Sequence, residues 1–218
     1  MWKSRRYLPH FIKMKMEVDI SRLRLEYLQY MQHRPWDAYE NEYKVLKEAW
    51  PGITKQCDWK NDSSAQMALT TYNPAYEIRP DRGSNTKWDT KFFKGDKKYD
   101  GRAYSVLKHD LPDYFRDVCN LFTPHRERVI LAKIGPGKVL ERHMDHDTTL
   151  SVRFHIPIIT DPRSMMLYGD DHQVHWPADG SVYFLNQGLK HGVFNGSDTD
   201  RIHLIINMDS QDLIWNRK

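Results

Sequence analysis

The sequence feature that most constrains the fold is a set of polar side chains divided between two distant segments. His143 and Asp145 lie two positions apart, and His191 follows 48 positions after His143. Side chains at positions i and i+2 of a β-strand point to the same face, so the first two can face a common point. His191 can reach that point only if the chain returns on a neighbouring strand. The pattern therefore favours a fold of facing β-strands.

Turn signals divide the chain from residue 128 onward into short segments typical of β-strands. Gly135-Pro136-Gly137 is a strong turn, and the sequences GDD (169–171) and GSD (196–198) separate further pairs of apolar segments. Residues 150–159 alternate between apolar and polar side chains, as in a strand with one buried face. About eight strands result, which is the number that a double-stranded β-helix (jelly roll, or cupin-like fold) needs.

The N-terminal half has helical rather than strand periodicity. We expect a helix that begins at Asp19 or Ser21 and ends before Pro35, and a further helix over 36–50. Another helix is expected over 104–122, interrupted near Pro112, and long loops with short strands over 57–101. The prediction is a mainly β chain with flanking helices in a single domain, 1–218. Residues 1–125 form a helical and loop region that packs on the barrel, 126–209 form the jelly-roll core with the site, and 210–218 form a C-terminal tail.

Composition narrows the function classes. The chain has 39% hydrophobic and 28% charged residues, and its net charge of +4 comes from interleaved basic and acidic residues, which gives little support to nucleic-acid binding. Two cysteines, Cys57 and Cys119, cannot form a disulfide framework, and no apolar run is long enough for a signal peptide or a membrane span. We expect a cytoplasmic protein with no membrane partner, and the sequence leaves the oligomeric state open.

The three residues of the divided pattern are the candidate metal ligands and catalytic residues. Two imidazoles and one carboxylate form the facial triad of non-haem Fe(II) oxygenases, which leaves coordination positions open. The competing interpretation is a chance His-x-Asp on an exposed strand, in a chain with 11 His and 29 acidic residues. His146 and Asp147 are alternative ligands, but we expect them at the surface or behind the ligands.

Basic side chains near the triad suit a second, anionic ligand. Arg201 follows His191 by ten residues, and a guanidinium can hold the far carboxylate of a dicarboxylate cosubstrate in a bidentate contact. His203 shares a strand face with Arg201 and could line the same cavity. Arg153 and His155 form another polar pair on a predicted barrel strand, and they either face water or help to hold the cosubstrate.

The segments that carry these residues are similar to a known enzyme group. KVLERHMDHDTTLSVRFHIPI (138–158) and GSVYFLNQGLKHGVFNGSDTDRIHLIINMD (180–209) resemble the Fe(II)/2-oxoglutarate-dependent oxygenases. Within them the resemblance is to the aspartyl/asparaginyl β-hydroxylase group, which includes bacterial proline hydroxylases. The ten-residue step from His191 to Arg201 matches specifically, as does Arg153-x-His155, which contacts the cosubstrate in that group. The resemblance implies that 2-oxoglutarate binds the iron and that Arg201 holds its distal carboxylate.

Two positions depart from related patterns. The aspartyl/asparaginyl β-hydroxylases themselves lack the carboxylate ligand, whereas this chain has Asp145, as the proline hydroxylases do. In the base-repair demethylases of the wider superfamily a second Arg follows the cosubstrate Arg by six residues. Here that position is Asn207, which counts against repair of alkylated DNA.

The resemblance therefore implies a dioxygenase that uses Fe(II) and 2-oxoglutarate, with O2, to hydroxylate an unactivated C–H bond. The substrate it suggests is a small molecule or peptide: a free amino acid or an amino-acid side chain within a peptide. We expect residues 57–101 and 161–172 to form a lid over it. Two alternatives stay open: a cupin-like metalloprotein with isomerase or lyase activity, and a non-catalytic binding module.

Overall fold

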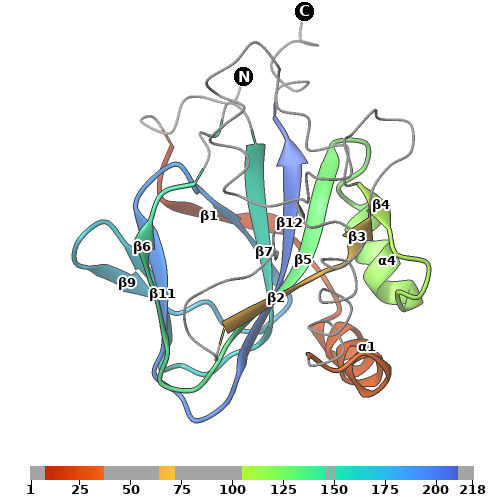
Figure 1. Ribbon diagram of the computed structural model, residues 1–218. Coiled ribbons are helices and arrows are strands. Elements are labelled where there is room, and N and C mark those ends of the chain that lie inside the picture. The colour runs from red at the N-terminus through yellow and green to blue at the C-terminus, as the bar shows by residue number, and fades with distance from the viewer. Residues whose placement is uncertain (1–7, 37–63, 72–104, 146–147, 149–150, 211–218) are drawn as a thin grey trace, which may run out of the picture.

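The computed structural model describes residues 8–36, 64–71, 105–145, 148 and 151–210 (Figure 1). Two α-helices lie among these residues, α1 (Ile20–His33) and α4 (Asp113–Asn120). The strands are β1 (Phe11–Glu17), β2 (Ser64–Ala68), β3 (Thr70–Thr71), β4 (Val106–Leu107), β5 (Arg126–Ile134), β6 (Val139–His143), β7 (Ser151–Ile159), β8 (Ser164–Tyr168), β9 (His172–Val174), β10 (Ser181–Leu185), β11 (His191–Asn195) and β12 (Arg201–Asp209).

Two antiparallel sheets form the barrel. The larger sheet has the strand order β1-β10-β7-β12-β5-β2, and the smaller has the order β6-β11-β8-β9. The sheets face each other in Figure 1, and buried side chains from both pack together between them, such as Tyr183 of β10 with Tyr168 of β8 and Val193 of β11. This is the predicted double-stranded β-helix, and β5 to β12 are the eight strands expected after residue 128. The larger sheet also takes in β1 and β2, which precede residue 126.

The central strands of the larger sheet separate the helices from the barrel interior. On β12, Ile202, Leu204 and Ile206 pack with side chains of α1 and α4 in one core cluster. Arg201 and His203, at the alternate positions, face the smaller sheet. The same alternation on β7 directs Arg153 and His155 into the interior. All four predicted polar residues therefore lie on the site side of the sheet.

The helix α1 begins where the sequence predicts. The side chain of Asp19 caps it by accepting a hydrogen bond from the Arg22 N–H at 3.0 Å, and the helix ends at His33, two residues before Pro35. Leu23, Tyr27 and Tyr30, at helical spacing, are its buried residues. Of the two predicted N-caps, Asp19 is therefore the correct one.

Two predictions for the N-terminal half are confirmed in part. The helix expected over 104–122 is interrupted near Pro112, as predicted, but only α4 is helical, and the segment before Pro112 contains the short strand β4. Among the short strands expected within 57–101, residues 64–68 form β2, which pairs with β5 from Ser64↔Ile134 to Ala68↔Ile130. The helix expected over 36–50 lies outside the described residues, apart from Trp36.

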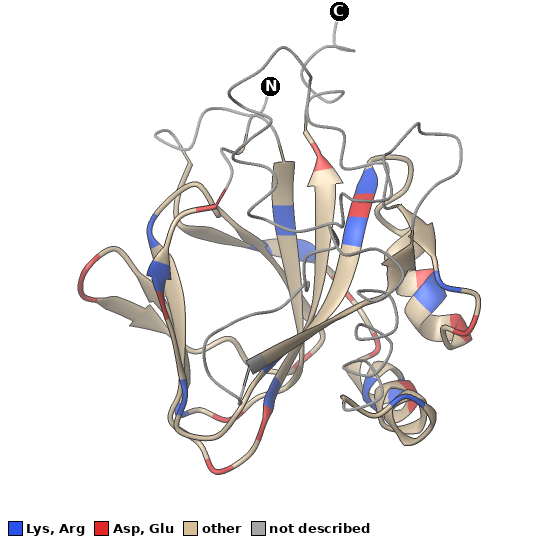
Figure 2. Ribbon diagram, in the orientation of Figure 1, with Lys and Arg blue, Asp and Glu red and all other residues tan. Residues whose placement is uncertain are grey.

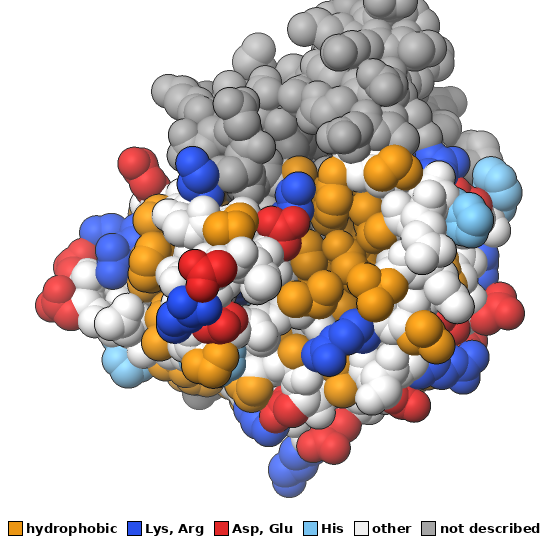
Figure 3. All heavy atoms as spheres, turned by 90° about the horizontal axis from the view of Figure 1, so that it is seen from below, with side chains coloured by type: hydrophobic (Ala, Val, Ile, Leu, Met, Phe, Trp, Pro, Cys, Tyr) orange, Lys and Arg blue, Asp and Glu red, His pale blue; other side chains and the backbone are white. Residues whose placement is uncertain are grey.

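Charged side chains are dispersed over the described surface. Both Lys or Arg and Asp or Glu residues are scattered along the strands and helices (Figure 2). In the view from below, hydrophobic side chains gather near the centre of the face while charges of both signs lie around its margin (Figure 3). The described side chains on this face do not form a single-signed stripe that would suit a nucleic-acid backbone. Among the described helices, none has both the length and the apolar character needed to span a membrane.

Candidate metal centre

The two histidines of the triad meet on neighbouring strands. His143 is the last residue of β6 and His191 the first of β11, and the antiparallel register places them directly opposite each other. Their imidazole ring centroids lie 4.5 Å apart. Residues 48 positions apart in sequence thus face one point, as the spacing predicts.

Asp145 completes the group just beyond the end of β6. Its backbone N–H donates a hydrogen bond to the carbonyl of Gln187 at 2.8 Å, which fixes the chain there. One carboxylate oxygen lies 3.8 Å from His143 Nε2, and the other lies 3.8 Å from His191 Nε2. All three ligand atoms are within 4.8 Å of one another. Metal–ligand bonds of about 2.0–2.2 Å can be accommodated at such separations with small side-chain adjustments.

Hydrogen bonds behind the rings present the correct nitrogen to a metal. His143 Nδ1 lies 2.8 Å from the carbonyl of Glu141, and His191 Nδ1 lies 2.8 Å from the carbonyl of Leu189. A carbonyl oxygen only accepts, so each Nδ1 carries the proton and each Nε2 keeps a lone pair for the metal. Burial also lowers the pKa of His191 to about 4, which keeps this imidazole neutral near pH 7.

A glycine allows the close approach of the two ligand strands. A Cβ atom on Gly192 would lie 2.7 Å from the backbone carbonyl oxygen of Leu140 and 3.1 Å from the backbone nitrogen of Arg142. The register between β6 and β11 shifts at this point, between His191 and Val193. A larger residue here would push β6 away from β11 and separate the histidines.

Arg153 lies against Asp145, one of the three candidate ligands, rather than in solvent. Its Nη1 is 2.5 Å from Asp145 Oδ2, and its Nε donates to Asn207 Oδ1 at 3.0 Å. The side chains of Arg153 and Asp145 are 13% and 16% exposed. The predicted contact of Arg153 with a cosubstrate stays a prediction, while its contact with the carboxylate ligand is a feature that the sequence analysis did not anticipate.

Arg201 is a buried cation deep in the barrel. Only 4% of the residue is exposed, and within the described part of the chain no carboxylate lies within ion-pair distance of it. Its Nη2 donates instead to Met166 Sδ at 3.0 Å and to His203 Nδ1 at 3.2 Å, which are weak or neutral acceptors. Burial lowers the pKa of Arg201 to about 9. The guanidinium is thus desolvated without receiving a matching anion from these residues.

Unpartnered polar atoms surround Arg201. Among the described residues, Tyr168 Oη, Trp176 Nε1 and the Nε2 atoms of His155 and His203 are buried and have no hydrogen-bond partner. His203 Nδ1 accepts from Arg201 and lies 3.4 Å from His155 Nδ1. Burial, followed by the nearby guanidinium groups, lowers the pKa of both histidines, so both are neutral. His203 is thus in direct contact with Arg201 on the shared strand face that the sequence predicts.

Tyr168 and Trp176 are site residues that the sequence analysis missed. Trp176 stacks on Tyr183 with ring centroids 4.6 Å apart, and it lies edge-on to His155 at 5.5 Å. Tyr168 ends β8, whose position beside β11 is known only once the strands pair. The signal available in the sequence was an aromatic residue with a polar atom, Tyr168, at the end of an apolar segment.

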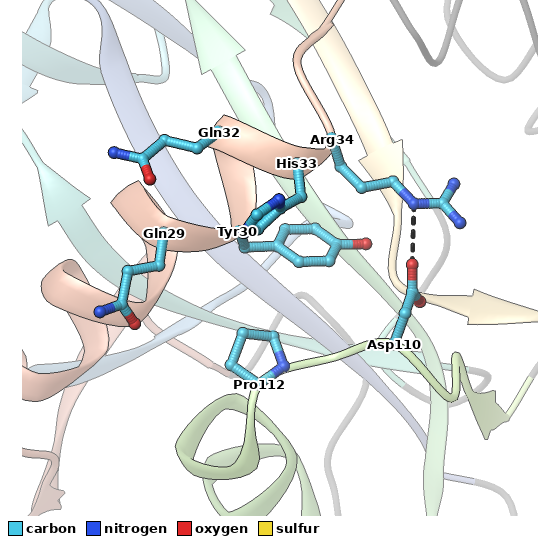
Figure 4. Close-up of a pocket in the computed structure, with 7 residues that line it drawn as sticks. All are labelled: Gln29, Tyr30, Gln32, His33, Arg34, Asp110 and Pro112. Carbon is cyan, nitrogen blue, oxygen red and sulfur yellow. Dashed lines mark ion pairs between the residues drawn. The ribbon is translucent and has the colours of Figure 1, made fainter.

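Most of the remaining predicted site residues are not among the described ones. His146, Asp147 and most of the expected lid (57–63 and 72–101) fall outside the described residues, whereas 161–172 form a turn and β8. A cavity of about 640 Å³ lies between α1 and the segment before α4, lined by Tyr30, His33, Arg34, Asp110 and neighbours (Figure 4). Because α1 packs on the opposite face of the larger sheet, this cavity is separate from the triad.

Solved structures with double-stranded β-helix domains resemble parts of this chain. A conserved protein from Klebsiella pneumoniae is 17% identical over 40% of this chain and 70% of its own, with a TM-score of 0.33. A cupin domain from Bordetella pertussis is 23% identical over 38% and 82% (TM-score 0.30). The non-heme monooxygenase ThoJ, as its nickel complex, is 20% identical over 44% and 50% (TM-score 0.33). Each alignment covers less than half of this chain, so the two sheets themselves identify the fold.

Comparison at the level of sequence gives the family. No curated protein matches this chain. The family model described as aspartyl/asparaginyl beta-hydroxylase matches residues 17–210, which include every strand from β2 to β12, the triad and Arg201. The chain therefore belongs to the aspartyl/asparaginyl β-hydroxylase family.

Proposed function

We propose that this protein is an Fe(II)- and 2-oxoglutarate-dependent dioxygenase that hydroxylates an unactivated C–H bond. Family membership supports an oxygenase or hydroxylase, and the His143–Asp145–His191 group supports a metal site. We also expect a cytoplasmic location, since the chain has only two cysteines, of which Cys119 is a buried free thiol.

The donor set fits a ferrous ion. Two imidazoles and one carboxylate coordinate one face of a metal ion and leave its other coordination positions for exogenous ligands. Bound iron, with 2-oxoglutarate and O2, would supply the oxidising power, the net result being an alcohol, succinate and CO2. His143, Asp145 and His191 hold the metal, and the carbonyls of Glu141 and Leu189 keep both rings in the tautomer that binds it.

The observation that carries the proposal is the buried guanidinium of Arg201. A desolvated cation is costly unless it has a partner, and the described part of the barrel gives it only a thioether and an imidazole. A dicarboxylate that binds the metal at one end could place its other carboxylate on Arg201. Tyr168 Oη, buried near this guanidinium, offers a further donor for the same carboxylate.

His155 and Arg153 would stand between the metal and Arg201. His155 is buried on β7, close enough to His191 and Arg201 for both to affect its pKa. Arg153 lies two residues away on the same face, against the metal ligand Asp145. We propose that His155 contacts the metal-binding end of the cosubstrate and that the remaining N–H groups of Arg153 assist.

The substrate class follows from the family, whose members act on small molecules or peptides. We propose a free amino acid or an amino-acid side chain within a peptide. A screen of succinate formation with Fe(II), O2 and 2-oxoglutarate, across free amino acids, peptides and nucleosides, tests the proposal. Product analysis by mass spectrometry should show a gain of one oxygen atom in the substrate.

Matched variants test whether succinate release depends on the proposed metal and cosubstrate site. His143→Ala, Asp145→Ala and Arg201→Ala should each abolish substrate-coupled succinate release. Arg34→Gln, which removes an ion pair with Asp110 on the far side of the sheet, should leave it unchanged (Figure 4). Iron-dependent turnover of a substrate without 2-oxoglutarate would instead identify a lyase or isomerase. Function that survives loss of the ligands would identify a binding module.

A further inference from the structure

The carboxylate ligand Asp145 is placed by residues outside its own strand. The strand β6 ends at His143, so backbone pairing within the sheet does not extend to Asp145. Its backbone N–H donates a hydrogen bond to the carbonyl of Gln187, and this contact does not determine the direction of the side chain. The side chain needs another support if both its oxygens are to face the two imidazoles.

A chain of polar contacts across three strands supplies that support. Arg128, on β5, accepts a hydrogen bond at its carbonyl from Asn207 Nδ2 of β12 at 3.0 Å. The Asn207 Oδ1 atom in turn accepts from Arg153 Nε of β7, and Arg153 Nη1 contacts Asp145 Oδ2. The register pairs Asn207 directly with Arg153 on the neighbouring strand β7. The contacts therefore connect three strands of the larger sheet to Asp145, which follows the end of β6.

We propose that Arg153 and Asn207 are positioning residues that hold the Asp145 carboxylate in the direction required for metal binding. The inference rests on the proposed metal site and assigns to Asn207 a role in that site. The planar guanidinium suits this task, because Nε and Nη1 can bond two different acceptors at a fixed angle. Groups that orient a metal ligand in this way commonly contribute a factor of about 10 to 100 in metal affinity.

Charge alone predicts the opposite effect for Arg153. A guanidinium beside a metal ligand repels an incoming cation and competes with it for the carboxylate. If Arg153 only neutralised Asp145, its removal would tighten metal binding. If it orients Asp145, its removal weakens metal binding despite the lost repulsion. The direction of the change in affinity therefore separates the two roles.

The experiment measures the dissociation constant of Co(II) from the full-length protein, by its visible absorption in competition with a chelator. Arg153→Gln should weaken Co(II) binding by about 10-fold or more. Arg153→Lys keeps the charge but cannot bond Asn207 and Asp145 together, so it should restore at most part of the affinity. Asn207→Ala changes no charge, and we expect it to weaken binding about 3- to 10-fold.

Arg34→Gln serves as the matched control, because Arg34 pairs with Asp110 far from the triad and should not affect Co(II) binding. Thermal unfolding without metal shows whether each variant is folded, and Asn207→Ala decides the question if the Arg153 variants are not. Unchanged or tighter binding in Arg153→Gln or Asn207→Ala, beside a wild-type protein that binds Co(II), would overturn this inference alone. A wild-type protein that does not bind Co(II) would overturn the proposed function as well.

Discussion

Replacement of Arg201 by methionine should stabilise the metal-free protein while it abolishes the response to 2-oxoglutarate. The guanidinium is desolvated and lacks an acidic partner among the described residues. Burial lowers its pKa from 12.5 to about 9, which corresponds to about 5 kcal/mol of unfavourable free energy for the charged form. Methionine is apolar and of similar length, so Arg201→Met removes this penalty without a large cavity.

The variant also loses favourable contacts. The hydrogen bonds to Met166 Sδ and His203 Nδ1 together contribute about 2 kcal/mol. The difference leaves a gain of about 3 kcal/mol in the free energy of unfolding. For a chain of this size, about 2–4 °C per kcal/mol gives an increase of about 6–12 °C in melting temperature.

Differential scanning calorimetry measures both effects when it compares the metal-free proteins, and then the Mn(II)-loaded proteins without and with 2-oxoglutarate in the absence of oxygen. Ligand at 100 times its dissociation constant should stabilise the wild-type protein by about 2.7 kcal/mol and should not stabilise the variant. Arg163→Met, which removes an exposed arginine that pairs with Asp161 and Asp198, is the control and should change stability by about 0.5 kcal/mol or less. A metal-free Arg201→Met protein that melts below the wild type would refute the reasoning, because it would mean that the protein itself satisfies the guanidinium.

Three further predictions follow from burial and close packing. Between pH 7.5 and 5.5 the metal-free protein should lose about 1 kcal/mol from His191 alone, because the unfolded chain takes up a proton near pH 6.5 while the folded one does so at about 4. This contribution to stability falls as the pH falls and levels off below about pH 4. The two buried histidines beside Arg201, His155 and His203, act in the same direction. Denaturant titrations measure the free energy of unfolding across this pH range, and a flat profile would contradict the prediction. Gly192→Ala should weaken Co(II) binding at least about 10-fold, because the added methyl group would meet the carbonyl of Leu140 and separate β6 from β11. A wild-type affinity in a calorimetric titration of the variant would count against this. Asn195→Ala should reduce the free energy of unfolding by about 2–3 kcal/mol, because Asn195 Nδ2 donates to the carbonyls of Ile134, Gly135 and Thr199. A melting temperature within about 1–2 °C of the wild type would show that these carbonyls find other partners.

The parts of the fold that depend on local pattern were predictable. The turn at Gly135-Pro136-Gly137 correctly predicted a strand directly after it, and Gly137 adopts φ 67° there. The strand ends at His143, although we expected it to continue to Asp145. The alternation on the last strand correctly separated Arg201 and His203 from the apolar face. Strand alternation is a property of consecutive residues, so the sequence carries it directly.

The parts that depend on long-range pairing were not predictable. The addition of β2 to the sheet is set by the free edge of β5, more than 60 residues away, and its own sequence has no strong strand signal. The polar contacts from Asn207 to Asp145 join residues 62 positions apart across three elements. Tyr168 likewise faces Arg201 only because β8 pairs with β11. Such neighbours follow from topology, which spacing in one sequence does not specify.

The strand order of the smaller sheet has a consequence for the protein without its metal. The strand β6 lies at the edge of this sheet, where β11 is its only described neighbour, so one ligand comes from an outermost strand and another from an interior one. A bound cation would act as a cross-link between the two strands at the point where His143 and His191 pair. Chelation should therefore loosen β6 before the rest of the sheet, and amide hydrogen exchange would detect this as faster exchange confined to that margin of the barrel.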